Sequence, residues 1–522
     1  MAKTKGFLCE RVHIFDSLTK KPKDIHENMR KRFEQQGKLG VISIPDRIIR
    51  GLPLKSRDEL PPILRALQHI YVTPELNEEV FRILETKVMK GKKKTGRYGM
   101  DLWHILVLSA VRLGLDADYD RLQDFANHHN LIRQILGVET TFGEVKVFLM
   151  QSIKDNISLL DEETIRQINE VVISSGHQLV KKKDEGLRIK VDTYVLETNV
   201  HFPTDMNLLW DAGRKSLDMI EDAIEEGILE WKGWRKGKYW RRELKKLMRI
   251  SAKASSGGGK NKEAIEKEHV RSYLKLSRSL SGKIGASLLA IYERVLTTNQ
   301  VEMHAKKIET LEYFHGMLNK QIDLVERRMI RDETIPAEEK IHSLFEPHTE
   351  WLYKGKSNKR VELGHNILVT SDQWGFIVDH LVVEKQADVS LSIPLADRLL
   401  SRYGEGVIKS ISFDKGFYKK ENKELLSLYI PAVIMPKKGK KNKAEQEEES
   451  SKTFKKLRHK HSAVESDINR LEHHGLDRCP DKGLNAFKRY CALGVLAANL
   501  HKLGNVLQEK AREQCEKLRK AA

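Results

Sequence analysis

The sequence predicts a mixed α/β core that is interrupted by a long helical insertion and preceded by an all-helical region. Three observations favour this class. Apolar residues recur at helical spacing over the first 175 or so residues. Strand-like segments begin at Leu187 and resume only near Val361, with helical segments between the later strands. The residues between, from Asn207 to about Phe345, have the pattern of long, charged, amphipathic helices.

Composition sets the size and the expected partner. The chain has 522 residues, which at about 150 residues per domain predicts three or four structural units. Lys and Arg number 93 against 74 Asp and Glu, a formal net charge of +19, and 40% of the residues are hydrophobic. A globular protein with this excess of positive charge is expected to bind a polyanion, with an anionic membrane or solubility alone as the alternatives.

Cysteine usage and hydropathy predict the compartment. The four cysteines form no C-x-x-C pair, which favours a reduced environment. No stretch approaches about eighteen uncharged apolar residues, and charged residues interrupt any apolar signal core at the amino terminus. We therefore expect a cytoplasmic protein that neither enters a membrane nor is exported.

Helical signals are clearest at two places in the amino-terminal region. Thr73, Pro74 and Glu75 supply an N-cap, a first-turn proline and a first-turn acid ahead of apolar residues at helical spacing. The segment 102–113 is apolar nearly all round, so we expect a helix that is buried on every side. Two short helical patterns joined at 127–130 fit a helix-turn-helix, although packing in a helical bundle explains them as well.

The first strand-like segment starts the α/β core. Apolar and polar residues alternate from Leu187, and β-forming residues continue to Phe202, which predicts a strand that enters a hairpin. Pro203, Thr204 and Asp205 then open a helix. Residues 255–259 have the composition of a flexible linker. Later strands are predicted at 361–370, 376–383, 407–413 and 429–435, and later helices at 395–402, 421–428 and 458–471.

Three acidic residues stand where such a core would place a ligand site. Asp192 lies within the first strand, and Asp414 follows another strand at its carboxyl end, where ligands of open sheets gather. Glu465 lies beside the apolar stripe of the helix 458–471. Two aspartates from neighbouring strands and a glutamate from a later helix supply the hard oxygen ligands that two divalent cations need. Turn capping is the alternative role of Asp414.

The segments around these acids resemble the Asp/Asp/Glu motifs of bacterial insertion-sequence DDE transposases, which have a ribonuclease-H-like core. The similarity is carried by Val191-Asp192-Thr193, Asn199 with Pro203-Thr204-Asp205, Phe413-Asp414-Lys415-Gly416-Phe417 and His461-Ser462-Ala463-Val464-Glu465-Ser466, with further similarity at 345–351, 354–356 and 475–479.

The resemblance implies a domain plan and an α+β fold. The core would be a ribonuclease-H-like mixed sheet flanked by helices, formed by residues 176–206 and 346–510 around a helical insertion at 207–345. Residues 1–175 would form a helical domain for DNA binding and subunit contact, and residues 511–522 a C-terminal tail.

The resemblance also implies a chemistry. Asp192, Asp414 and Glu465 would bind two Mg²⁺ or Mn²⁺ ions, cleave transposon ends and join the freed 3′-hydroxyl to target DNA. Many relatives carry a lysine seven residues beyond the glutamate, where this chain has Glu472, so Glu472 and Asp467 remain alternatives for the third acid.

The implied partner is double-stranded DNA, bound by a homo-oligomer, a dimer on DNA, without a nucleotide cofactor and at the nucleoid of a prokaryotic cytoplasm. Two other functions remain open: a metal-dependent DNA nuclease without strand transfer, and a catalytically inactive, transposase-derived DNA-binding repressor.

Two segments are candidates for DNA contact. Cations between residues 231 and 242 can neutralise phosphates and the tryptophans among them can stack on unpaired bases, although these tryptophans could instead form the core of the insertion. The candidates here are Trp231, Trp234, Arg235, Lys236, Lys238, Trp240, Arg241 and Arg242. Nearer Glu465 the candidates are Arg458 and His461, with Lys437 and Lys438 from a lysine-rich segment that we expect to be a mobile loop.

Overall fold

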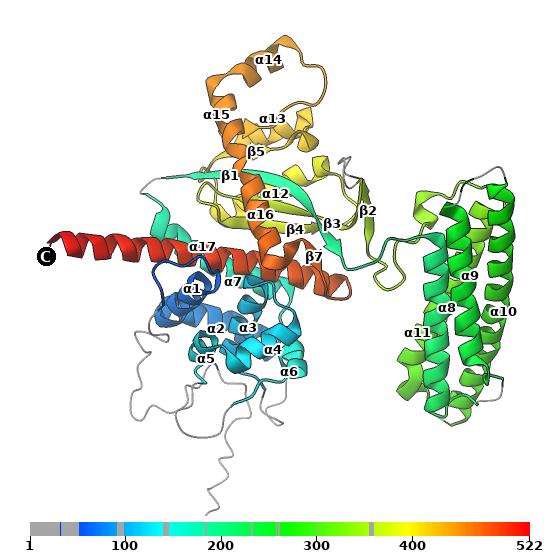
Figure 1. Cartoon of the computed structure of the whole chain (residues 1–522). Coiled ribbons are helices and arrows are strands. Elements are labelled where there is room, and N and C mark those ends of the chain that lie inside the picture. The colour runs from blue at the N-terminus through cyan, green and yellow to red at the C-terminus, as the bar shows by residue number, and fades with distance from the viewer. Residues whose placement is uncertain are drawn as a thin grey trace, which may run out of the picture.

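The chain forms a seven-stranded mixed sheet flanked by helices, with a helical bundle beside it (Figure 1). The computed structural model describes residue 32 and residues 52–90, 99–138, 146–182, 185–230, 233–256, 258, 261–298, 300–353 and 360–521. One hydrophobic core joins the amino-terminal helices to the sheet, and a second lies inside the bundle. The predicted α+β class is therefore confirmed.

The sheet is built around β1 (Leu187–Thr198). β3 (Val361–Ser371) pairs with β1 antiparallel and β5 (Ile408–Phe413) pairs with it parallel. The strand order is β2-β3-β1-β5-β6, with β4 on β3 and β7 on β1. The prediction of a hairpin after β1 is wrong, because its antiparallel partner comes only after the whole insertion. The other strands are β2 (Glu350–Tyr353), β4 (Ile377–Val383), β6 (Val433–Ile434) and β7 (Arg478–Cys479).

The amino-terminal helices pack against the last helix, α17 (Leu484–Ala521). α3 is buried at every residue, as its apolar pattern predicts, and the Trp103 Nε1 at its start donates to the Ile135 carbonyl at 2.8 Å. The segments on either side of 127–130 are α4 and α5. The helices of this region are α1 (Leu60–Val72), α2 (Pro74–Val88), α3 (Leu102–Gly114), α4 (Tyr119–His128), α5 (Asn130–Ile135), α6 (Met150–Ile157) and α7 (Glu162–Val180).

α17 also closes an edge of the sheet. Among the described strands β4 pairs only with β3, so its outer edge needs other hydrogen-bond partners. The Asn499 side-chain amide accepts from the Ile377 N–H and donates to the Ile377 carbonyl, both at 2.9 Å. It also donates to Asn169 of α7 at 2.8 Å. These bonds tie the helical layer and the sheet into one body.

The insertion is a bundle of four helices with its own core. Thr204 caps the first helix by accepting a hydrogen bond from the Asn207 N–H at 3.3 Å, as the sequence predicts. Of the predicted linker at 255–259, Ser255 and Ser256 belong to the end of the helix that begins at Gly237, and residues 257 and 259 lie outside the described residues. The helices are α8 (Asp205–Glu225), α9 (Gly237–Ser256), α10 (Lys262–Thr297) and α11 (Val301–Met329).

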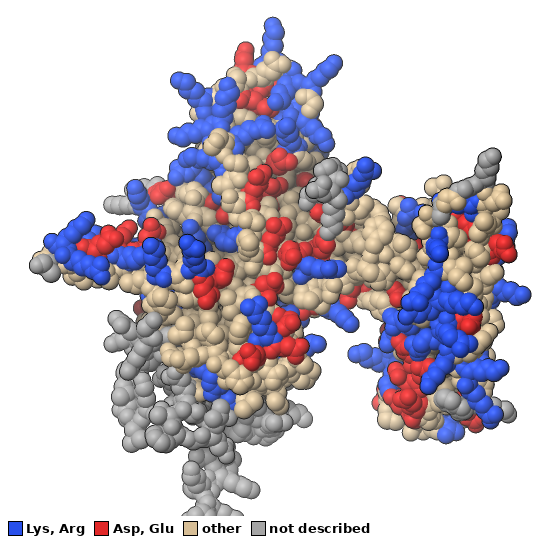
Figure 2. All heavy atoms as spheres, viewed as in Figure 1, with Lys and Arg blue, Asp and Glu red and all other residues tan. Residues whose placement is uncertain are grey.

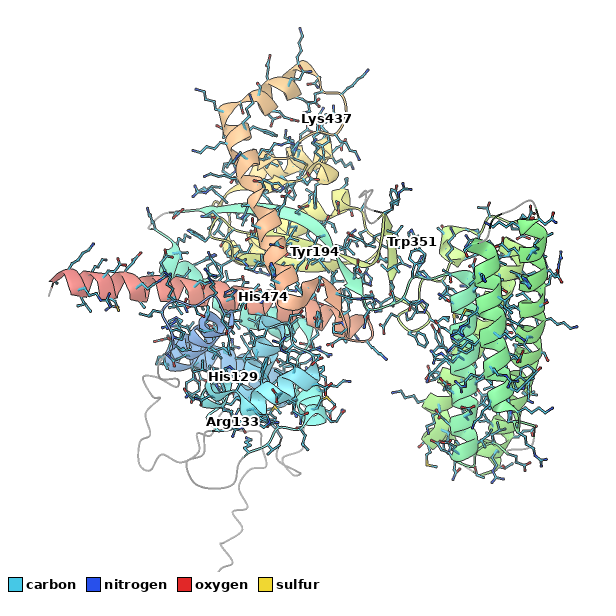
Figure 3. The ribbon with its side chains drawn as sticks, in the orientation of Figure 1. His129, Arg133, Tyr194, Trp351, Lys437 and His474 are labelled. Atoms are coloured by element: carbon cyan, nitrogen blue, oxygen red, sulfur yellow. The ribbon has the colours of Figure 1, made fainter. Side chains whose placement is uncertain are left out.

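The lysine-rich segment near residue 440 is a loop in part, since residues 435–442 have no regular secondary structure. It contains a helix, α14, that begins with a capping box formed by Asn442 and Glu445. Lys437 pairs with Glu445 at 2.8 Å and fixes the segment in front of the helix (Figure 3). The predicted helix at 458–471 is divided at Ser462. The remaining helices are α12 (Asp388–Tyr403), α13 (Lys420–Tyr429), α14 (Lys443–Ser450), α15 (Lys452–His461) and α16 (Ala463–Leu471), with short turns at Ala337–Glu339, Lys415–Phe417 and Glu472–Leu476.

None of the helices in the described part of the chain combines the length and the apolar character that a membrane-spanning segment needs.

Candidate active site and nucleic-acid interface

Asp192 and Asp414 lie side by side at the ends of the paired stretches of two adjacent parallel strands. Val191 of β1 pairs with Phe413 of β5, and each of these two residues is followed directly by one of the aspartates. Asp414 keeps an extended backbone (φ −74°, ψ 168°), so it continues the strand direction. Paired residues of a parallel ladder point to the same face, and both aspartates therefore point to the face opposite to that of Val191 and Phe413. Asp192 is half-buried and Asp414 is exposed.

The segment α15–α16 covers this same face. Lys190 and Ser412 form the pair two positions before the aspartates, and so share their face. Lys190 Nζ donates to Asp467 Oδ2 of α16 at 2.9 Å. His461 Nδ1, at the end of α15, lies 3.1 Å from Ser412 Oγ. The two aspartates therefore point toward α15–α16.

α15 and α16 cross the strands of the sheet, with α15 against β5 and β6 and α16 against β1 and β3 (Figure 1). Asp467 of α16 contacts Lys190 of β1. Glu472, just past the end of the helix, is close enough for its charge to affect the phenol of Tyr194, which lies further along β1 (Figure 3). Burial raises the pKa of the Tyr194 phenol, and the nearby Glu472 carboxylate raises it further.

Glu465 lies between His461, which contacts β5 at Ser412, and Asp467, which contacts β1 at Lys190. Glu465 follows His461 by one helical turn, since Ser462 between the two helices keeps helical angles (φ −56°, ψ −20°). Glu465 is exposed, as Asp414 is.

Asp467 is a poor candidate for the third acid because it is already paired. Its side chain is 8% exposed and contacts Lys190 at 2.9 Å and Arg470 at 3.5 Å. Removing it from Lys190 would leave a buried cation alone, at a cost of about 3–5 kcal/mol. Glu472 is exposed and remains an alternative to Glu465.

The three acids suit a hard cation by type but not by their present spacing. Carboxylate oxygens are the ligands that Mg²⁺ and Mn²⁺ prefer. Among the residues that the structure describes, no three His, Cys, Asp or Glu side chains are close enough together to hold a metal ion. Asp192, Asp414 and Glu465 are therefore not a preassembled metal cage.

Asp388 is a nearby carboxylate that the sequence analysis did not single out. It is the first residue of α12, and Thr193 Oγ1 donates to its Oδ1 at 3.3 Å. A Cβ atom on Gly416 would lie 3.0 Å from Asp388 Oδ2, so this glycine permits the close approach. Asp388 thus lies beside Thr193, which follows Asp192, and beside Gly416, which is two residues after Asp414. Its sequence position looks like that of any acid in a first helical turn, so no signal distinguished it.

A polar cavity of about 570 Å³ opens beside the acid site. Its walls include Ser412 and three cations, of which Arg188 pairs with Glu185 at 3.0 Å and Lys190 pairs with Asp467 at 2.9 Å, while Lys460 is the third. The Arg188 Nε is buried without a hydrogen-bond partner among the described atoms. Lys460 and the Arg188 Nε are thus the donors that this cavity offers to a phosphate group next to the aspartates.

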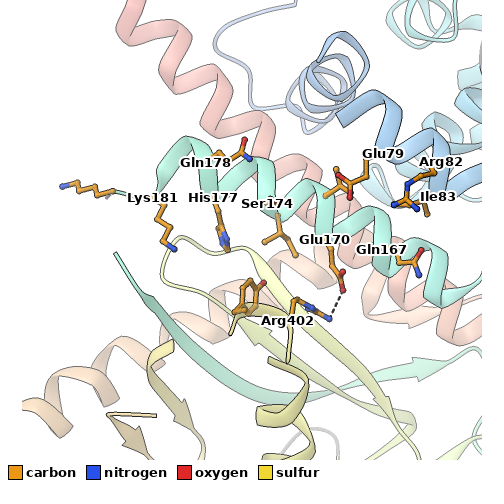
Figure 4. A pocket seen from close by; sticks show the side chains of 14 residues that line it. Glu79, Arg82, Ile83, Gln167, Glu170, Ser174, His177, Gln178, Lys181 and Arg402 are labelled. Atoms are coloured by element: carbon orange, nitrogen blue, oxygen red, sulfur yellow. Dashed lines mark ion pairs between the residues drawn. The ribbon is translucent and has the colours of Figure 1, made fainter. Parts of the chain in front are cut away.

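Another cavity, of about 780 Å³, lies between α2, α7 and α12 (Figure 4). Arg402 pairs there with Glu170 at 3.0 Å, and the His177 Nε2 lies 2.6 Å from the buried carboxylate of Asp372. None of the predicted site residues lines this cavity. It is therefore separate from the chemistry predicted from the sequence.

The residues predicted to contact DNA near Glu465 have different surroundings. Lys438 and Arg458 are exposed, although Arg458 lies 3.8 Å from Glu449. The Lys437 ammonium is paired with Glu445. Burial lowers the pKa of His461 even though Asp414 raises it, so this imidazole is largely neutral at pH 7. His461 is thus a hydrogen-bonding group in the wall of the site and adds no full charge.

The prediction that Trp234 stacks on DNA bases is wrong. Its side chain is 4% exposed within the bundle core, and its Nε1 donates to Ser287 Oγ at 2.8 Å. Lys283 covers the ring, with its Nζ 4.7 Å from the ring centroid. Trp240 packs against the same core, and Trp231 lies outside the described residues. The alternative, that the tryptophans form the core of the insertion, holds for Trp234.

The cations of this stretch are mostly on the surface. Arg235, Lys236 and Lys238 are exposed. Arg242 is exposed and lies 3.2 Å from Glu243. Arg241 differs, because it pairs with two carboxylates of α8. It is therefore engaged within the bundle.

The segment 345–351, part of the family resemblance, anchors the chain where it returns from the insertion. His348 Nδ1 lies 2.9 Å from His365 Nε2 of β3, and its Nε2 lies 3.0 Å from Glu346 Oε2. Glu346 also accepts the Gly483 N–H at 2.7 Å, just before α17. Burial lowers the pKa of His365. This network has a structural role at the base of the insertion.

Comparison of the chain with protein-family models, with curated proteins and with solved structures gave no match. What the chain does must therefore be inferred from its own residues.

Proposed function

We propose that this chain is a DDE-type DNA transposase that cleaves the ends of a DNA element and joins the freed 3′-hydroxyl to target DNA, acting as a dimer on DNA. The observation that carries the proposal is the register of β1 and β5, which makes Asp192 and Asp414 neighbours below the helix with Glu465. The strand order, with antiparallel strands on one side of β1 and a parallel crossover on the other, supports a ribonuclease-H-like arrangement. The charge of +19 supports a nucleic-acid substrate.

Divalent cations are part of this proposal. Asp192, Asp414 and Glu465 would hold Mg²⁺ or Mn²⁺, which activates water and stabilises the leaving oxygen in phosphodiester cleavage. Like charges repel, so three carboxylates without a cation are expected to stand apart, as they do here.

The surrounding residues would position the substrate. The buried pair of Lys190 and Asp467 holds α16 on the sheet and so fixes the backbone that carries Glu465. Arg188 and Lys460 in the adjoining cavity would neutralise the phosphate next to the cleaved bond.

The first experiment is cleavage of DNA that carries the sequences flanking the gene, in Mg²⁺. Asp192→Asn, Asp414→Asn and Glu465→Gln are each expected to lose at least about a hundredfold in cleavage rate and to keep DNA binding. Glu472→Gln is the matched control, since it changes an exposed acid at the end of the same helix. If Glu472→Gln rather than Glu465→Gln abolishes cleavage, the third acid is Glu472; if all variants cleave normally, the proposal is wrong.

Thermal unfolding tests the metal site without relying on activity. Mg²⁺ is expected to raise the Tm of the wild-type protein and not that of Asp414→Asn. The reaction products then separate the functions: a 3′-hydroxyl joined to new DNA supports a transposase, cleavage alone a nuclease, and binding without cleavage a repressor.

A further inference from the structure

We infer that the outer face of α9 binds the phosphate backbone of double-stranded DNA. This surface, called the α9 ridge, consists of Lys238, Arg242, Lys245, Lys246, Arg249 and Lys253. The inference rests on the proposed function in one respect: the DNA bound by the ridge is taken to be the substrate of the transposase. The charge and shape of the ridge stand independently of the acid site.

The six cations lie on one side of α9. At 3.6 residues per turn they fall within about 100° of the helix circumference. Leu244, Leu247 and Met248 lie on the opposite side and pack in the bundle core. All six cations are exposed. They therefore form one stripe along the bundle, and Figure 2 shows Lys and Arg gathered as a band on the bundle.

Acids do not neutralise the ridge. α9 has seven Lys and Arg residues and one acid, Glu243, which lies 3.2 Å from Arg242 and 3.6 Å from Lys246. α11 of the same bundle has five cations and five acids. The positive excess is thus a property of α9 and is not shared by every helix of the bundle. A concentrated excess of this kind raises the local concentration of polyanions.

The shape of the ridge favours duplex DNA. From Lys238 to Lys253 it spans about 22 Å at 1.5 Å per residue. A DNA duplex carries one negative charge per about 1.7 Å of its axis, so several phosphates lie within that length. Single-stranded DNA usually needs several exposed rings for stacking, whereas Trp234 is buried, Trp240 packs against the core, and Tyr239 is the one exposed ring of α9 beside six cations. The ridge therefore fits contacts to the backbone, without base readout.

The test compares two double variants of the full chain that have the same net charge. Lys245→Glu with Lys253→Glu alters the ridge, and Lys275→Glu with Lys306→Glu alters exposed lysines of α10 and α11. Binding to a duplex of about 30 base pairs of arbitrary sequence is measured at several salt concentrations without divalent cations, so no cleavage occurs. The ridge variant is expected to bind at least about tenfold more weakly, with a slope of log K against log salt that is smaller by about 2. The control is expected to change the affinity less than about twofold.

Three outcomes would overturn the inference: unchanged binding by the ridge variant, equal loss in both variants, or a larger loss toward anionic vesicles or single-stranded DNA than toward duplex DNA. Equal unfolding midpoints for the two variants would show that the fold is preserved. If the ridge variant binds duplex DNA more weakly but the wild-type protein never cleaves DNA, the proposed function is rejected and the inference about the ridge stands. If the wild-type protein cleaves DNA but the ridge variant binds it normally, the inference about the ridge is rejected and the proposed function stands.

Discussion

The main body, which is the sheet with the amino-terminal helices and α17, differs from the insertion bundle, α8–α11, in the ion pairs that it buries between distant elements. The body buries ion pairs such as Lys190–Asp467 and Arg112–Asp481 within its core. The α9 ridge of the bundle keeps its excess of charge on the surface. Buried pairs fix the positions of the elements that carry them, and exposed charges stay available to a partner.

The pair of Arg112 and Asp481 illustrates the first strategy. Arg112 is 2% exposed and bonds Asp481 at 2.6 and 3.1 Å, while its guanidinium lies 4.0 Å from the centroid of the Tyr119 ring. Such a pair contributes little net stability, but loss of one partner leaves an uncompensated buried charge. It therefore specifies how α3 sits against the chain that leads into α17.

The largest expected effect tests whether the two cores unfold independently. Trp103→Ala removes a fully buried ring from the body, which is expected to cost about 3–5 kcal/mol. Leu318→Ala, at a fully buried position of the bundle, is expected to cost about 2–5 kcal/mol. In urea unfolding followed by hydrogen exchange, each variant should lower protection only in its own core. Equal loss in both cores would mean that body and bundle unfold as one unit.

The second prediction uses acid to separate the regions. Burial lowers the pKa of His104 to about 3 and those of His380 and His474 to about 4, and all three lie in the main body. Their folded values lie below the unfolded value of about 6.5, so their stabilising contribution is present above that pH and is lost as the pH falls. Each of these histidines lowers the free energy of unfolding by about 1.4 kcal/mol per pH unit as the pH falls from about 6.5 toward 4.

Urea unfolding at pH 7 and pH 5 measures this effect. The body is expected to lose several kcal/mol on acidification and the bundle less. His128→Gln is the control because that imidazole is exposed, and it should leave the difference unchanged. A bundle that loses stability before the body would contradict the comparison.

The smallest expected effect concerns Trp234. Trp234→Phe removes the hydrogen bond to Ser287 and leaves the buried hydroxyl without that partner, at a cost of about 1–3 kcal/mol to the bundle alone. Binding to distorted DNA ends should not change. Ser287→Ala is the companion variant, since it removes the same bond from the other side. Weaker binding at unchanged stability would restore the stacking role that the buried ring argues against.

Local patterns predicted several elements correctly. The all-apolar segment became α3, buried at every residue, and Thr204 caps α8 as its sequence neighbourhood indicates. The same patterns missed β2 and α14 and predicted that Trp234 is available to DNA. Short strands and caps give weak periodic signals, and a ring beside cations looks alike on a surface and in a core.

For the candidate site, the sequence by itself determined the types of the acids, their places at a strand, a strand end and a helix, and the excess of positive charge. Only the tertiary structure decided that Val191 pairs with Phe413, that Asp467 forms an ion pair with Lys190, and that Asp388 lies close to Gly416. Periodicity reports whether a side chain faces core or solvent, because that depends on neighbours along the chain. Register, pairing and the neighbours of a buried charge depend on contacts between residues far apart in sequence, which no local pattern encodes.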